Sequence, residues 1–115
     1  YRLWVTVRGQ VNNEKNHAKD GMVMDFNFLK KIVKPEIIDK YDHSFVINAN
    51  SPHANVDLSS FEKVFLLPYQ PTSENLVEDF ANKIKAKLPE GIQLYKVVLS
   101  ETATSFAEWN YKDNM

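Results

Sequence analysis

The sequence contains no cysteine, and this absence removes several kinds of chemistry from its 115 residues. A disulfide framework, a thiolate nucleophile and a cysteine-based zinc site all need a residue that the chain does not have. An excess of basic residues is also missing, because 14 lysines and arginines stand against 15 aspartates and glutamates. The net charge of -1 provides no electrostatic footprint for nucleic acid or for an anionic membrane surface. Small molecules or other proteins are therefore the expected partners.

Long apolar runs are absent as well. No segment approaches the roughly 20 residues that span a bilayer, and the beginning of the chain does not resemble a signal peptide. The sequence therefore predicts a soluble, cytoplasmic protein with no membrane partner, and its length fits one domain over residues 1–115. The first residues, YRLWVTVRG, begin in what looks like mid-strand, so we expect this domain to be incomplete upstream of Tyr1.

Hydrophobic periodicity predicts one strand followed by two helices. Residues 1–8 alternate between apolar and other side chains, which indicates a strand with one buried face. Residues 25–41 follow a helical period, with Asp25 as the N-cap and either a kink or a restart at Pro35. A continuous apolar stripe from residue 76 to residue 88 predicts the second helix.

The C-terminal third predicts an antiparallel pair of strands, over residues 92–101 and 105–111, and KVFLLPY (63–69) predicts a short extended piece. With one more strand upstream, the element order becomes ββααββ. We therefore expect an α+β fold in which an antiparallel sheet carries both helices on one face. The other face, which carries several aromatic side chains, would need cover from another subunit.

Asp42 and His43 are the first candidates for chemistry. A carboxylate next to the side chain that titrates near neutral pH is the combination that general acid and base catalysis requires. Adjacent residues on a regular helix point apart, however, so the pair could cooperate only where the backbone leaves the helix. An ordinary polar helix end is the alternative. His17 and His53 lie in polar loops, without partners at metal-ligand spacing.

Two further candidates are polar groups at the ends of predicted elements. Glu101 ends an apolar strand, where a carboxylate could bind a ligand rich in hydrogen-bond donors or simply be solvated. Thr72, Ser73 and Glu74 begin the second helix and are expected to cap it whatever else they do. Glycine-rich phosphate loops and the GxSxG and HExxH motifs are missing from the sequence.

Four short motifs occur in order along the chain: GMVMDF (21–26), YDHSFVIN (41–48), PTSEN (71–75) and VVLSET (97–102). This series resembles the 6-pyruvoyltetrahydropterin synthase and 6-carboxytetrahydropterin synthase family over nearly the whole chain. The resemblance implies the tunnelling fold, in which ββααββ subunits join as homotrimers, often paired into homohexamers, around a barrel of strands. In such an assembly, another subunit would cover the aromatic face of the sheet.

The resemblance implies roles for individual residues. Asp42 and His43 would belong to the proton-transfer machinery, and Glu101 would anchor the pterin. One carboxylate can accept hydrogen bonds from both the exocyclic amine and the neighbouring ring N–H of a pterin. The PTSEN turn would contribute to the substrate pocket. Its candidate substrate contacts are Thr72, Ser73 and Glu74.

The resemblance also implies zinc, which the family binds through three histidines and accompanies with a catalytic cysteine. All of these positions would precede Tyr1, and neither His17 nor His53 matches them, so we expect no metal ligand in this chain. The implied activity is that of a lyase. It converts 7,8-dihydroneopterin triphosphate to 6-carboxy-5,6,7,8-tetrahydropterin, with release of acetaldehyde and triphosphate, for queuosine and related deazapurines. The alternatives are the 6-pyruvoyltetrahydropterin product of the tetrahydrobiopterin pathway, or a non-catalytic pterin-binding or assembly subunit.

Overall fold

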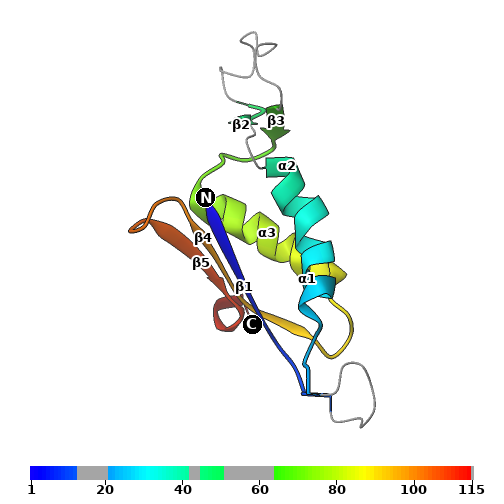
Figure 1. The fold of residues 1–115 in the computed structure, drawn as a ribbon. Coiled ribbons are helices and arrows are strands. Elements are labelled where there is room, and N and C mark those ends of the chain that lie inside the picture. The colour runs from blue at the N-terminus through cyan, green and yellow to red at the C-terminus, as the bar shows by residue number, and fades with distance from the viewer. Residues whose placement is uncertain (13–20, 42–44, 51–63, 115) are drawn as a thin grey trace.

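The computed structural model describes residues 1–12, 21–41, 45–50 and 64–114. The elements in chain order are β1 (Arg2–Arg8), α1 (Phe26–Val33), a π-helical turn (Lys34–Ile38), α2 (Asp39–Tyr41), β2 (Phe45–Asn48), β3 (Val64–Leu67), α3 (Ser73–Lys87), β4 (Gln93–Ser100), β5 (Phe106–Asn110) and a final 3-10 turn (Tyr111–Asn114). The sheet of β1, β4 and β5 has three strands, and Figure 1 shows the long helical segments on one side of it.

The three-stranded sheet has the order β1-β4-β5, and both strand pairs are antiparallel. Its side chains alternate between the two faces, as the period of a strand requires. Leu3, Val5 and Val7 of β1 face the helices and are half-buried, whereas Arg2 and Trp4 face outward. The predicted α+β class, with an antiparallel sheet and both helices on one face, is confirmed.

The core lies between α3 and the inner face of the sheet. The apolar stripe of α3 packs there because its members recur at three- and four-residue intervals along one side of the helix. Its buried residues are Leu76, Val77, Phe80, Ala81 and Ile84. The strands contribute Leu94, Val97, Leu99, Ala107 and Trp109. This packing confirms the second predicted helix and the predicted pair of C-terminal strands.

The first helical segment changes from an α-helix to a π-helical turn at Pro35, which stands at the beginning of that turn as the restart alternative expected. It continues through a π-helical turn, in which the N–H of Asp39 donates to the carbonyl of Lys34 five residues earlier. Proline lacks an N–H and its ring crowds the carbonyl four residues before it, so one wider turn accommodates Pro35 without ending the helix. Asp25 caps the segment as predicted, because its Oδ1 accepts from the N–H of Asn27 at 2.8 Å.

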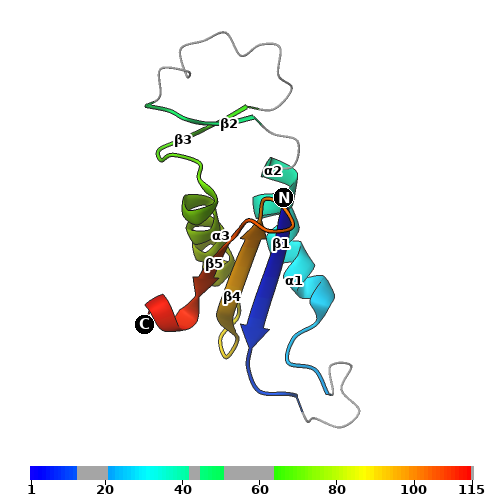
Figure 2. The same cartoon turned by 90° about the vertical axis from the view of Figure 1, so that its left-hand side faces the viewer.

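The strands β2 and β3 form a separate parallel pair, in register from Phe45 opposite Val64 to Asn48 opposite Leu67. Figure 2 shows this pair beyond the ends of α2 and α3, away from the three-stranded sheet. The predicted extended piece at 63–69 is therefore found as β3, whereas its pairing with β2 has no counterpart in the predicted order. Within the described ranges, no helix has both the length and the apolar composition to cross a membrane.

Candidate functional site

The predicted substrate contacts lie at one end of the three-stranded sheet. Figures 1 and 2 both place four segments there: the beginning of β1, the turn between β4 and β5, the beginning of α3 and the end of α2. Glu101 follows β4 directly, and residues 72–74 begin α3. The fold therefore gathers segments that are far apart in the sequence.

Asp42 and His43 lie outside the described residues. In the sequence they directly follow Tyr41, the last residue of α2. His17 and His53 likewise lie outside the described residues.

Glu101 is exposed at the rim of the sheet, where β4 turns toward β5. Its backbone N–H donates to the carbonyl of Ser105 at 2.8 Å, so the main chain at this position is held by the turn. Its carboxylate accepts a hydrogen bond from the Tyr1 hydroxyl at 3.2 Å. Partial burial, followed by the negative charge of Glu101, raises the pKa of Tyr1 above its ordinary value, which keeps the phenol protonated as a donor.

The turn before α3 uses its polar side chains in different ways. Thr72 is the N-cap, and its Oγ1 accepts from the N–H of Asn75 at 3.2 Å. The Oγ of Ser73 is buried and has no hydrogen-bond partner in the part of the chain that the structure describes. Leaving a buried hydroxyl without a hydrogen bond costs about 1–3 kcal/mol. Glu74 is exposed in the first turn of the helix.

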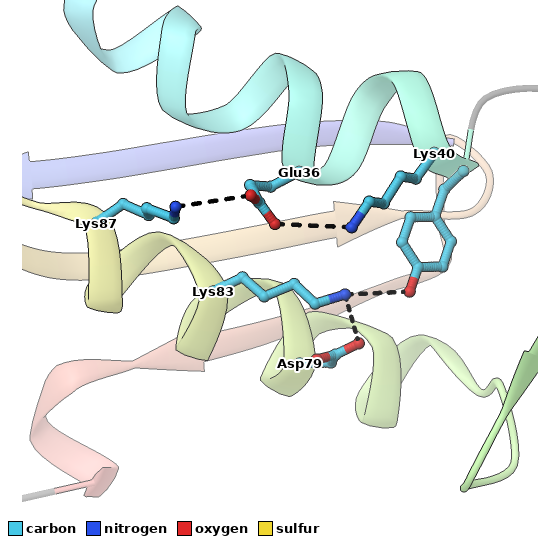
Figure 3. A network of polar contacts seen from close by, with 6 residues as sticks. Glu36, Lys40, Asp79, Lys83 and Lys87 are labelled. Atoms are coloured by element: carbon cyan, nitrogen blue, oxygen red, sulfur yellow. Dashed lines mark hydrogen bonds and ion pairs between the residues drawn. The ribbon is translucent and has the colours of Figure 1, made fainter.

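A polar network connects the end of α2 with α3, as Figure 3 shows. Lys83 donates to the Tyr41 hydroxyl at 3.3 Å and forms an ion pair with Asp79, also at 3.3 Å. Asp79 in turn accepts a hydrogen bond of 2.6 Å from the hydroxyl of Tyr69, which precedes the turn at 72–74. We call Tyr41, Lys83, Asp79 and Tyr69 the tyrosine–lysine network.

The charges in this network support one another. Burial raises the pKa of Tyr69, and the hydrogen bond to Asp79 raises it further, so the phenol stays protonated. Burial by itself lowers the pKa of Lys83. The hydrogen bond to Tyr41 and the negative charge of Asp79 outweigh that effect, and the pKa of Lys83 lies above its ordinary value. Lys83 is therefore positively charged at neutral pH, between two oxygen acceptors.

The described residues do not form a zinc site. In the ranges 1–12, 21–41, 45–50 and 64–114, histidine, cysteine, aspartate and glutamate nowhere gather in a group of three that could hold a metal ion.

The architecture defines the class of protein first. A crystal structure of an uncharacterized protein from Wolinella succinogenes has the same fold, with a TM-score of 0.72 and 19% sequence identity, over 95% of this chain and 75% of that one. The model of the family described as 6-pyruvoyl tetrahydropterin synthase matches residues 1–112. The chain belongs to this family, and its antiparallel sheet with two helices agrees with the tunnelling fold.

Two named relatives are similar to the chain over most of its length. It is 32% identical to the 6-carboxy-5,6,7,8-tetrahydropterin synthase of Haemophilus influenzae over 113 residues, which are 95% of this chain and 77% of the relative. It is 35% identical to the protein of the same name from Aquifex aeolicus over 119 residues, covering 95% of this chain and 70% of the relative. The predicted family and the predicted enzyme class are thereby confirmed.

Sequence reasoning did not reveal three members of the tyrosine–lysine network, Tyr69, Asp79 and Lys83. One signal for the ion pair was present, because Asp79 and Lys83 are four residues apart on a predicted helix. Their contacts with the two tyrosines depend on how α2 and the chain before α3 pack against that helix. The assigned roles of Glu101, residues 72–74 and the Asp42–His43 pair stay predictions.

Proposed function

We propose that the chain comes from an enzyme that converts 7,8-dihydroneopterin triphosphate to 6-carboxy-5,6,7,8-tetrahydropterin, with release of acetaldehyde and triphosphate. The observation that carries the proposal is the match to two synthases of that name, each over 95% of this chain. The product would supply queuosine and related deazapurines. The 6-pyruvoyl product and a non-catalytic pterin-binding subunit are the alternatives that an experiment must separate from this function.

Glu101 is the proposed anchor for the pterin ring. A carboxylate at an open rim can reach a ligand without rearrangement of the core, and Glu101 is exposed. Its two oxygens offer about four lone-pair sites, so the hydrogen bond from Tyr1 leaves capacity for the exocyclic amine and the ring N–H of a pterin. Hydrogen bonds to an ionised acceptor are stronger than neutral ones, which suits a recognition contact.

Ser73 is the residue of the PTSEN turn whose hydroxyl is not used by the described residues. Its buried Oγ has no hydrogen-bond partner among the described residues, whereas the Oγ1 of Thr72 already caps α3. Glu74 lies in the first turn of the same helix, where its carboxylate also stabilises the positive end of the helix dipole. We assign Ser73 to the pocket first, with Thr72 and Glu74 beside it.

Asp42 and His43 are the proposed acid and base. A histidine oriented by a neighbouring carboxylate can accept a proton and return it at neutral pH. The pair follows Tyr41, the last residue of α2, whose hydroxyl accepts from Lys83 of α3. Zinc is part of the proposal through the family alone, with ligands outside the described residues.

The outer face of the three-stranded sheet supports a homo-oligomer. Trp4 and Phe106 are 50% and 65% exposed on this face, and apolar patches of this kind mark interaction surfaces. A homotrimer that closes the strands into a barrel, alone or paired into a homohexamer, would cover them. We place this assembly in the cytoplasm, with no membrane or nucleic-acid partner.

The test is incubation of the full-length protein with 7,8-dihydroneopterin triphosphate, followed by mass spectrometry of the products. The expected result is 6-carboxytetrahydropterin with acetaldehyde. A 6-pyruvoyl product would move the chain to the other branch of the family. Tight pterin binding without turnover would identify the non-catalytic subunit, and an absence of both would refute the pterin assignment.

Variants test the residue roles within the same assay. Glu101→Gln is expected to weaken pterin binding by about tenfold or more, because it removes a charged acceptor of two hydrogen bonds. Glu78→Gln, on the exposed side of α3, is the matched control and should change little. His43→Ala is expected to lower kcat by about 100-fold to 10,000-fold with binding largely kept. Unchanged affinity in Glu101→Gln would remove Glu101 from the site.

A further inference from the structure

Glu101 has a hydrogen-bond partner from the other end of the chain. Tyr1 precedes β1, and its hydroxyl donates to Oε1 of Glu101 at 3.2 Å, although the two residues are 100 positions apart. We propose that Tyr1 is a positioning residue, which sets the orientation of the Glu101 carboxylate before a pterin binds. The inference rests on the proposed function, because Glu101 is the proposed anchor for the pterin ring.

The register of the sheet places Tyr1 and Glu101 opposite each other. In the ladder between β1 and β4, Arg2 lies opposite Ser100. One position before Arg2 and one position after Ser100, the same register pairs Tyr1 with Glu101. Residues directly opposite each other on antiparallel strands have Cβ atoms about 4.5–5.5 Å apart, which brings their side chains within reach. The hydrogen bond therefore follows from the strand pairing, which also holds the two residues at this separation.

The pair lies at the rim of the face that carries the helices. Side chains two positions apart on a strand share a face, and Leu3 and Leu99 both pack on the helix side of the sheet. Tyr1 and Glu101 extend this row past the end of the sheet, where Figures 1 and 2 show the beginning of α3. Tyr1 is 75% exposed, and Glu101 is also exposed. A ligand at this rim can therefore reach the carboxylate.

The main chain at Glu101 is held by the turn that follows it. The Oγ1 of Thr102 accepts from the N–H of Thr104 at 3.3 Å and from the N–H of Ser105 at 3.1 Å. The carbonyl of Ser105 accepts from the N–H of Glu101 at 2.8 Å and from that of Thr102 at 3.3 Å. These bonds fix the backbone from which the Glu101 side chain extends, and the hydrogen bond from Tyr1 acts on the carboxylate itself.

A carboxylate that is already oriented binds a ligand more tightly. Immobilising a side chain with several rotatable bonds during binding lowers affinity by about twofold to tenfold, and a restraint present beforehand removes part of that loss. The raised pKa of the Tyr1 phenol keeps its proton in place at neutral pH, so the hydroxyl donates and the carboxylate accepts. Tyr1 occupies one lone pair of Oε1, and the others remain for the amine and the ring N–H of a pterin.

The first test measures the affinity of the full-length protein for neopterin, followed by the fluorescence of the ligand. Tyr1→Phe removes the hydroxyl, keeps the ring and is expected to weaken binding by about threefold to tenfold. Tyr95→Phe is the matched control, because it removes a hydroxyl from β4 and keeps the ring over which Arg8 lies. It should leave the affinity unchanged. Wild-type affinity in Tyr1→Phe would overturn the proposal.

A double-mutant cycle separates positioning from direct contact with the ligand. Glu101→Ala weakens neopterin binding at the outset, and Tyr1→Phe should then have little further effect, since no carboxylate remains to be oriented. Equal losses of affinity from Tyr1→Phe with and without the Glu101 carboxylate would show that Tyr1 acts on the ligand or on the fold. Such a result would remove its role as a positioning residue.

A readout without ligand separates this inference from the proposed function. The ¹³C chemical shift of the Glu101 carboxyl carbon should change in Tyr1→Phe and keep its wild-type value in Tyr95→Phe. If the shift changes in this way but wild-type protein binds no neopterin, the proposed function fails and the orientation of Glu101 by Tyr1 stands. An unchanged shift in Tyr1→Phe would refute the inference even in a protein that makes the expected pterin product.

Discussion

The two faces of the three-stranded sheet differ sharply although the same strands build them. On the inner face Val97, Leu99 and Trp109 are at most 6% exposed, because α3 packs over them. On the outer face Trp4 is 50% exposed, and Phe106 is 65% exposed. Large aromatic side chains thus occur on both faces, but the described residues cover only one of them.

This difference separates folding from assembly. Burial of apolar area contributes roughly 25 cal/mol per Å², so the covered face accounts for much of the stability of the single chain. The open face retains apolar area that the described residues leave in contact with water. Substitutions at neighbouring positions of β4 are therefore expected to have different effects. A change at Val97 should affect folding, and a change at Val98 should affect association.

The largest expected effect comes from placing a charge on each face in turn. Val97→Asp buries an unpaired carboxylate at a position with 0% exposure and should cost roughly 4–5 kcal/mol or more, enough to unfold a marginally stable chain. Val98→Asp should keep the protomer folded, because this side chain is on the outer face opposite Trp4. Circular dichroism and urea unfolding measure the contrast. Equal unfolding of both variants would show that the outer face is also part of the folding core.

The next largest expected effect is on the association of protomers and not on their folding. Trp4→Lys places a charge in the middle of the exposed face and is expected to dissociate the proposed homo-oligomer, with secondary structure kept. Light scattering or sedimentation gives the mass of the particle. The matched control is Ala86→Lys on the exposed side of α3, which should leave the assembly intact. A Trp4→Lys variant with an unchanged mass would place the interface elsewhere.

A smaller effect tests the helix that covers the inner face. Thr72→Ala removes the N-cap of α3 and should destabilise the protein by about 1 kcal/mol, measured by urea unfolding. Ser73→Ala should cost less or even stabilise the chain, because its buried hydroxyl has no partner among the described residues. The effect on pterin affinity should have the opposite order, with a larger loss in Ser73→Ala than in Thr72→Ala. If Thr72→Ala and Ser73→Ala bound the pterin with equal affinity, the assignment of Ser73 to the substrate pocket would be wrong.

The smallest expected effect is a loss of stability at alkaline pH that is caused by Tyr69 and Lys83. The pKa values of Tyr69 and Lys83 are both raised above their ordinary values of 10.0 and 10.5, so the folded state holds these protons more tightly than the unfolded state. Their contribution is fully present below about pH 10 and is lost as the pH rises through the raised values. Urea midpoints from pH 8 to pH 11 should fall less steeply in Tyr69→Phe than in wild type, with Tyr95→Phe as the control. If the urea midpoints of wild type, Tyr69→Phe and Tyr95→Phe fell in parallel, the pH dependence could not be assigned to Tyr69.

Several features of the fold and site were predictable because their causes are local. The alternation in residues 1–8 and the stripe from 76 to 88 follow from strand and helix periodicity, and both elements are found. The caps at Asp25 and Thr72 depend on a side chain and an N–H two or three residues away. The four motifs, read in order, indicated the family that the comparison confirms.

Other features depend on contacts between distant segments. The parallel pairing of β2 with β3 joins two four-residue strands with weak periodicity, and the π-helical turn at Pro35 is one of several ways to accommodate a proline. The links from Tyr41 and Tyr69 to α3 arise only when the chain on both sides packs against it. Short patterns carry little information about such pairings, because loop closure and side-chain packing decide them.

The sequence by itself determined the identity of the main helices and strands, the charge balance, the family and the residue types available for chemistry, since each follows from local patterns or from ordered motifs. Only the tertiary structure decided which face of the sheet α3 covers with its own side chains, that the Ser73 hydroxyl is buried without a partner in the described residues, and that Lys83 connects Tyr41 to Asp79. The physical reason is that the burial and the hydrogen-bond partners of a side chain depend on segments that are distant in the sequence. The energy of each contact in turn depends on the surroundings that these segments create.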